Sequence, residues 1–216
     1  MKRFFGLNVW LAVLVVAGVQ SAALGYMIVD RAGLLQHGRE IVLDVQPVDP
    51  RSLFQGDYVI LNYGALSRID GAFLKDMPDG TRTLYVTARK GVLPQGEIVQ
   101  GDGGQGEERQ RQQSEPVVGW MPVAVSVSYP ASVADGDVVL RGNVPEHYAL
   151  RLSAMGSTPV DYGIESYFVP EGEGKRLEKL IGKGEMRVIA AVGPDGRTAI
   201  KGIEAEGNRV YEERVW

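Results

Sequence analysis

The sequence predicts a mainly β (α+β) compact domain attached to an N-terminal transmembrane helix. Three observations predict this architecture. A long apolar stretch without charged residues stands near the N-terminus, the rest of the chain carries short runs of alternating apolar residues, and 28 glycines and 11 prolines among the 216 residues supply turns between these runs. We therefore divide the chain into residues 1–39, with a short cytoplasmic tail, the transmembrane helix and a juxtamembrane extension, and residues 40–216, which form the β-rich domain.

Residues 4–29 form the predicted membrane span, because no charged residue stands between Arg3 and Asp30. A helix over this stretch is about 39 Å long at ~1.5 Å per residue, which exceeds the ~30 Å hydrocarbon core of a bilayer. A cleaved signal peptide is the alternative, since Ser21 and Ala23 have the spacing of a small-x-small cleavage site. The apolar run is longer than the usual core of a signal peptide and continues past Ala23, which favours a retained anchor.

The orientation of the helix is predicted from the residues on its two sides. Lys2 and Arg3 precede the apolar stretch and Arg31 and Arg39 follow it, so the bias of positive charge is small. A short basic tail that leads an apolar segment is nevertheless typical of a signal anchor, whose N-terminus stays inside the cell. We expect the domain that follows the helix to be exported.

Small residues recur on one side of the predicted helix. Ala17, Ser21 and Gly25 stand four residues apart, and small residues at this spacing let two membrane helices approach closely. Membrane helices are also rich in small residues in general, so composition alone is a second explanation. The hypothesis is that these three residues pack against a helix of a multi-spanning membrane protein.

Alternating apolar residues and turn residues predict the elements of the domain. Strands are expected at residues 41–46, 58–63, 83–89, 121–129, 138–141, 148–152, 166–169, 186–192, 197–203 and 210–216, and short helices at 65–73 and 175–181. The first two strands are expected to form a pair. Residues 186–192 and 197–203 are expected to form a hairpin across a Gly-Pro-Asp-Gly turn. Residues 100–115 contain no hydrophobic residue to bury, so we expect a disordered loop there.

Residues 56–63 read Gly-Asp-Tyr-Val-Ile-Leu-Asn-Tyr, a turn followed by a strand with apolar or aromatic residues on both faces. This octet resembles the signature of the GDYXXLXY-domain family, a group of bacterial membrane-anchored proteins without an established biochemical activity. The residues at its five named positions are Gly56, Asp57, Tyr58, Leu61 and Tyr63.

A second block, residues 162–172, is similar to the other characteristic segment of that family and follows about a hundred residues later. The likeness runs roughly from residue 42 to residue 211. The resemblance implies an architecture and a location: one anchor helix in the bacterial inner membrane and a domain in the periplasm. It implies no catalytic residues.

Several kinds of chemistry are disfavoured by composition. The absence of cysteine excludes disulfides and thiolate catalysis. The only histidines, His37 and His147, lack a second ligand at the i+4 spacing of a helical zinc site, so no metal site is predicted. Basic residues are scattered and the net charge is −4, which disfavours nucleic-acid binding. No cofactor and no catalytic residue is predicted.

One stretch keeps a hydrolase hypothesis open. Residues 49–58 are similar to the active-site segment of membrane-anchored signal peptidases. When the Gly-Asp pairs are aligned, however, Val48 takes the place of the nucleophilic serine, and Ser52 falls after the proline. Lys75 and Lys90 are the nearest candidate bases, and neither has a peptidase-like context.

The remaining candidates for a polar binding site are carboxylates and tyrosines of the two family segments: Asp57, Tyr58, Tyr63, Glu165 and Glu171. Glu165 is expected to pair with Arg51 or Arg151, while turn or core positions are the structural alternatives for these residues. The leading hypothesis is a non-catalytic, single-pass membrane protein that acts through a membrane or envelope partner. A diverged signal-peptidase-like hydrolase and an envelope ligand-binding module with a tyrosine-lined pocket are the alternatives.

Overall fold

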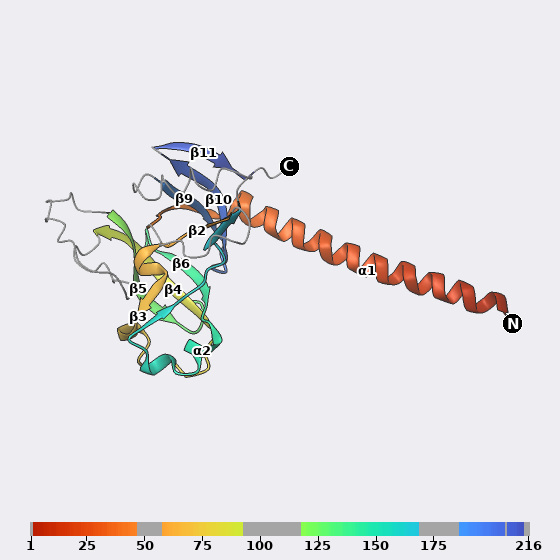
Figure 1. Cartoon of the computed structure of the whole chain (residues 1–216), viewed down its shortest axis with the longest axis horizontal. Coiled ribbons are helices and arrows are strands. Elements are labelled where there is room, and N and C mark those ends of the chain that lie inside the picture. The colour runs from red at the N-terminus through yellow and green to blue at the C-terminus, as the bar shows by residue number, and fades with distance from the viewer. Residues whose placement is uncertain (1, 47–57, 93–117, 169–185, 206, 214–216) are drawn as a thin grey trace.

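The computed structural model describes residues 2–46, 58–92, 118–168, 186–205 and 207–213. One long helix projects from a domain of short strands (Figure 1). The helices are α1 (Lys2–His37) and α2 (Glu146–Ala149), with 3-10 turns η1 (Gly64–Leu66), η2 (Gly71–Phe73) and η3 (Leu152–Ala154). The strands are β1 (Arg39–Asp44), β2 (Tyr58–Ile60), β3 (Arg68–Asp70), β4 (Thr83–Val92), β5 (Val118–Ser126), β6 (Val138–Asn143), β7 (Ser157–Pro159), β8 (Ser166–Phe168), β9 (Met186–Val192), β10 (Thr198–Ala205) and β11 (Asn208–Glu212).

The strands form two larger and two small sheets, and every pairing is antiparallel. The larger sheets have the orders β1-β9-β10-β11 and β5-β4-β6, and the small ones are β2-β8 and β3-β7. The two larger sheets lie against each other (Figure 1), and the Trp120 indole of β5 donates to the Val42 carbonyl of β1 at 2.9 Å. A β-rich fold with one long N-terminal helix confirms the predicted fold class.

The hydrophobic core lies where strands of both larger sheets meet. Alternation explains which residues enter it. Leu84, Val86 and Ala88 of β4 are fully buried, as their period-2 spacing predicts. In β1, Ile41 and Leu43 are buried while Asp44 faces solvent.

The predicted hairpin at 186–192 and 197–203 is confirmed by β9 and β10. Gly196 adopts a φ of 81° in the turn between them, a left-handed conformation that glycine adopts without strain. The first helix ends just before Gly38, whose amide closes the last turn on the Leu34 carbonyl at 2.9 Å. At the opposite edge of this sheet, β11 confirms a last strand that begins slightly earlier than expected.

The predicted helix at 65–73 is wrong. This stretch contains η1, then β3, then η2, and β3 pairs with β7 far along the chain. A Cβ on Gly71 would lie 2.1 Å from the Met155 carbonyl oxygen, so the backbone passes too close to its neighbour for a regular helix surface. The helix-like spacing of apolar residues arises because Leu66 and Ile69 reach one core from irregular backbone.

The predicted strand at 148–152 is also wrong. Pro145 precedes α2 with a φ of −57°, which suits the start of a helix. Ala149 of α2 and Leu152 of η3 are both buried, so the chain reaches the core here from a short helix and a 3-10 turn and not from an alternating strand.

The expected pairing of strands 41–46 and 58–63 is largely wrong. β1 pairs with β9 and β2 pairs with β8, and only the bridge between Gln46 and Asn62 joins the two segments. The loop expected at 100–115 and the helix expected at 175–181 lie outside the described residues.

Candidate functional site

The two family segments lie side by side. β2 and β8 pair in the register Tyr58 with Phe168, Val59 with Tyr167 and Ile60 with Ser166. Just beyond β2, the Leu61 amide donates to the Glu165 carbonyl at 2.8 Å. Segments about a hundred residues apart in sequence therefore form one unit.

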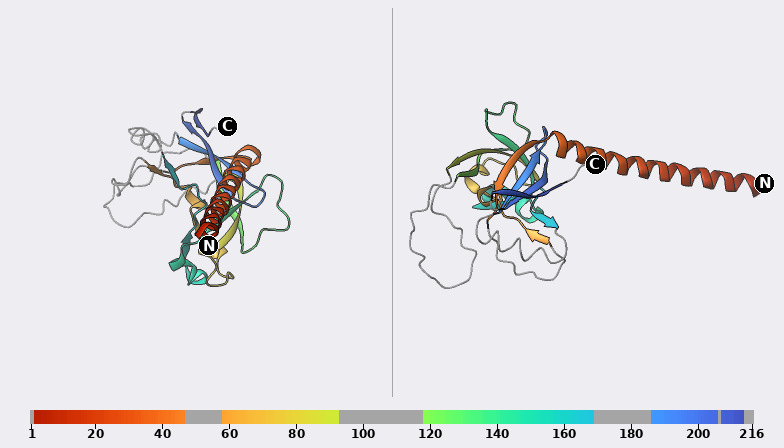
Figure 2. Two further views of the ribbon diagram at one scale, coloured as in Figure 1. Left: turned by 90° about the vertical axis from the view of Figure 1, so that its right-hand side faces the viewer. Right: turned by 90° about the horizontal axis from the view of Figure 1, so that it is seen from above.

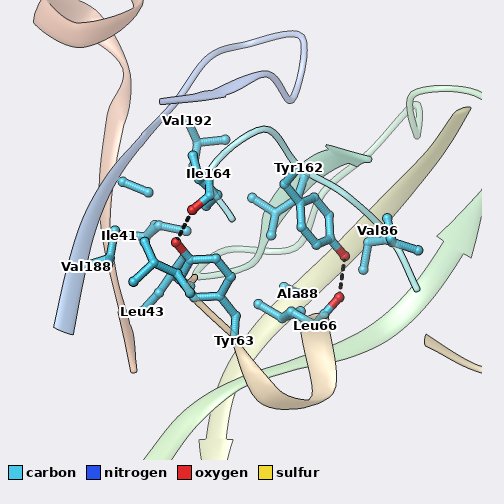
Figure 3. Close-up of a cluster of buried hydrophobic side chains, with 14 of the residues drawn as sticks. Ile41, Leu43, Tyr63, Leu66, Val86, Ala88, Tyr162, Ile164, Val188 and Val192 are labelled. Atoms are coloured by element: carbon cyan, nitrogen blue, oxygen red, sulfur yellow. Dashed lines mark hydrogen bonds between the residues drawn. The ribbon is translucent and has the colours of Figure 1, made fainter. Parts of the chain in front are cut away.

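Tyr63 is a core residue rather than part of an open surface. Only 5% of it is exposed, and its ring packs beside Ile41 and Leu43 (Figure 3). Its hydroxyl donates to the Ile164 carbonyl at 2.5 Å. Burial, together with the nearby Glu165 carboxylate, raises the pKa of the Tyr63 hydroxyl well above its usual value, so this group acts as a neutral donor.

A second tyrosine makes the reciprocal contact. Tyr162, which is also 5% exposed, donates its hydroxyl to the Leu66 carbonyl at 2.9 Å (Figure 3). Tyr63 of the first family segment thus binds a backbone carbonyl of the second, and Tyr162 of the second binds a carbonyl of η1, which directly follows the first. We call Tyr63, Ile164, Tyr162 and Leu66 the tyrosine latch. Burial also raises the pKa of Tyr162.

Glu165 binds the backbone of its own loop. Its carboxylate accepts from the amides of Tyr162 at 2.5 Å, Gly163 at 2.8 Å and Ile164 at 3.0 Å. Gly163 has a φ of 82°, and this left-handed residue lets successive amides point at one anion. Burial raises the pKa of the Glu165 carboxyl even though the backbone amides of Tyr162, Gly163 and Glu165 itself lower it, and the charge of Asp161 raises it further.

The expected ion pair of Glu165 with Arg151 is therefore wrong. Within the part of the chain that the structure describes, the partners of the Glu165 carboxylate are backbone amides. These amide donors engage both oxygens of the carboxylate. Asp57, Glu171 and Arg51 lie outside the described residues, and Tyr58 contributes its backbone to β2.

The arrangement uses its polar groups to hold the fold together. The hydroxyls of Tyr63 and Tyr162 and the carboxylate of Glu165 all point at backbone groups, which leaves them poorly placed to act on a bound molecule. Among the described residues, no group of three or more His, Asp or Glu side chains could hold a metal ion. Sequence reasoning did not single out Tyr162, although a buried tyrosine normally requires a hydrogen-bond partner.

The hydrolase candidates gain no support from this geometry. Val48 and Ser52 lie outside the described residues. Lys75 and Lys90 are exposed, whereas a lysine that serves as a general base needs burial to lose its proton near neutral pH.

The surface of α1 is the second notable feature. Val9–His37 is long and apolar enough to cross a membrane, and its most apolar window is not buried against the domain. The exposed fractions of Trp10, Leu14 and Val29 are 70%, 68% and 71%. Two further views show α1 leading away from the domain (Figure 2). The apolar helix is a single membrane-spanning or signal segment.

The comparisons with known proteins return one match. A family model described as GDYXXLXY protein matches residues 20–203, most of the chain. The matched range begins within α1 and ends within β10, so it includes both family segments and the end of the helix. No curated protein and no solved structure matches the chain.

Proposed function

The chain belongs to the GDYXXLXY protein family, and from this premise we propose that it is a single-pass protein of the bacterial inner membrane whose domain lies in the periplasm and binds a partner without catalysis. α1 is the retained anchor, with its N-terminus in the cytoplasm. The partner is a multi-spanning membrane protein that meets the chain through α1.

One observation about α1 carries this proposal. Most of the helix has an exposed apolar surface, while its last turns are packed against the domain. Val29 is 71% exposed, while Leu35, six residues later, is 5% exposed. Apolar side chains on such a helix favour a lipid environment over water by about 25 cal/mol for each Å² that is covered. A bilayer covers the free part of α1 and leaves the last turns to the domain.

The same feature favours a retained anchor over a cleaved leader. Cleavage after Ala23 would leave Leu24, Met27, Ile28 and Val29 on a helical stub that continues into the docked turns. Their exposed fractions lie between 59% and 71%. Such a stub would present a contiguous apolar patch to water, which soluble proteins rarely do.

Membrane retention is the first prediction. In cells that express the full chain with a C-terminal tag, we expect the protein to stay in the membrane pellet after alkaline carbonate extraction and to keep the mass of the uncleaved chain. A C-terminal alkaline phosphatase fusion is expected to be active, because that enzyme needs export. Soluble protein that begins at Leu24, or an inactive fusion at normal expression, would contradict the proposal.

A partner helix is the second prediction. A photo-crosslinking residue at Ala17, Ser21 or Gly25 is expected to capture one membrane protein. Val19 is the matched control, because a residue two positions from Ser21 points about 200° away around the helix. We expect the specific crosslink to be about tenfold weaker from Val19 than from Ser21 if the helix packs through its small face. Equal crosslinking from both positions, or none from the small residues, would count against the partner.

A further inference from the structure

The last turns of α1 are packed tightly against the hairpin of β9 and β10. Leu35 is buried, and a single residue, Gly38, separates the end of α1 from the start of β1. This connection is too short to act as a flexible linker.

Two glycines bring the helix and the hairpin into close contact. A Cβ on Gly38 would lie 3.0 Å from the Ala191 Cβ and 3.2 Å from the Val192 amide nitrogen. A Cβ on Gly193 would lie 3.0 Å from the Leu34 Cδ1. A larger side chain at Gly38 would press on the hairpin, and one at Gly193 would require the Leu34 side chain or the hairpin turn to shift.

An arginine fork joins the turn of the hairpin to the helix. Arg197 donates to both carboxylate oxygens of Asp30, at 2.5 and 3.0 Å, and its Nε donates to Asp195 at 2.5 Å. A bidentate pair of this kind fixes the relative orientation of the two side chains as well as the distance between them. Arg31 adds a weaker bond to the Thr198 carbonyl at 3.4 Å.

The contacts continue from this point into both larger sheets. The Arg141 amide of β6 donates to the Gly196 carbonyl in the hairpin turn at 2.7 Å. Arg39, the first residue of β1, donates to the carbonyls of Asp137 at 2.7 Å and Gly136 at 3.1 Å. The Asp137 carboxylate in turn binds Arg89 of β4.

We propose that Asp30, Leu34, Gly38, Gly193 and Arg197 form a rigid joint that makes α1 and the domain turn as one body. A domain on a flexible tether samples many orientations above the membrane, whereas this joint holds one orientation. A rotation or tilt that a membrane partner imposes on α1 is carried through the hairpin turn into the two larger sheets. The inference rests on the proposed function only in that α1 is held in a bilayer.

The absence of cysteine makes the joint directly measurable. Leu24 on the free part of α1 and Leu150, directly after α2, are 61% and 64% exposed, so each can be changed to cysteine and carry a spin label. In the full chain reconstituted in lipid nanodiscs, double electron–electron resonance is expected to give one narrow distance distribution between the labels. Arg197→Gln and Gly193→Val are each expected to broaden this distribution about twofold by loosening the joint.

Arg187→Gln is the matched control, because it removes the ion pair with Glu204 on the same two strands but away from α1. We expect it to leave the distribution unchanged. A broad distribution in the parent protein, or no broadening in either joint variant, would overturn the inference. Near-ultraviolet circular dichroism checks that each variant is folded. If Arg197→Gln does not fold, the distance distribution of Gly193→Val alone tests the joint. If the parent protein resists carbonate extraction but gives a broad distance distribution, the rigid joint is refuted while the proposal of a membrane anchor still stands.

Discussion

Replacing Tyr63 with alanine is expected to lower the free energy of unfolding by about 3–5 kcal/mol, the usual cost of removing a large aromatic side chain from a core. The ring packs in the centre of the domain, and its hydroxyl satisfies the Ile164 carbonyl. A loss of this size is a large part of the stability of a typical domain. Urea unfolding of the full chain in detergent micelles, followed by tyrosine and tryptophan fluorescence, measures it.

The phenylalanine variants separate the ring from the hydroxyl. Tyr63→Phe and Tyr162→Phe each remove one hydroxyl of the tyrosine latch and leave a buried carbonyl without its donor. Each is expected to lower the free energy of unfolding by about 1–3 kcal/mol. Tyr129→Phe is the control, because Tyr129 is 42% exposed and is expected to change stability by less than about 0.5 kcal/mol. If Tyr63→Ala cost no more than Tyr129→Phe, the latch would not stabilise the fold.

Replacing Glu165 with alanine is expected to cost about 2–3 kcal/mol, because it removes the acceptor of three backbone amides in a partly buried loop. The comparison variant is Glu146→Gln, whose exposed pair with Arg82 contributes at most about 1 kcal/mol. Urea unfolding at pH 7 again gives the difference. A cost for Glu165→Ala no larger than that of Glu146→Gln would show that the amides find other partners.

Glu165→Gln tests the charge of the same group. The pKa of Glu165 is raised in the folded protein, so the folded state binds its proton more tightly than the unfolded state. The resulting stability is fully present below the unfolded-state pKa, about 4.3, and is lost as pH rises through the folded-state pKa. The advantage of the parent protein over Glu165→Gln is therefore expected to shrink as pH rises from about 4 towards neutral. An advantage that grows over this range would mean that the amides lower the pKa after all.

These predictions give the family segments a structural role. Leu61 and Tyr63 occupy two named positions of the octet, and both are buried. Their partners Ile164 and Glu165 come from the other segment. Residues that hold two distant segments together at the centre of a fold are needed whatever the protein binds.

The rigid joint extends this view to the membrane. If α1 and the domain move as one body, a partner that contacts the helix inside the bilayer can alter the position of the domain outside it. Under the proposed function, that would let the domain respond to the state of a membrane partner, because a packed interface changes in steps and does not deform smoothly.

The sequence by itself determined the features that depend on neighbouring residues. The apolar span of α1, the alternation of β4 and the β9–β10 hairpin each follow from a local period or from turn residues. These strands and the long helix were therefore predicted, and the membrane location was inferred from charge, length and the family resemblance. The errors at 65–73 and 148–152 arose where apolar spacing was set by irregular backbone around one core.

Only the tertiary structure decided how distant groups meet. Tyr63 reaches Ile164 across 101 residues, and Arg197 reaches Asp30 across 167. Glu165 binds amides of its own loop that a left-handed glycine turns towards it, and not Arg151. Such hydrogen-bond pairs leave no periodic pattern in the sequence, because they depend on which buried groups the folded chain brings within hydrogen-bonding distance.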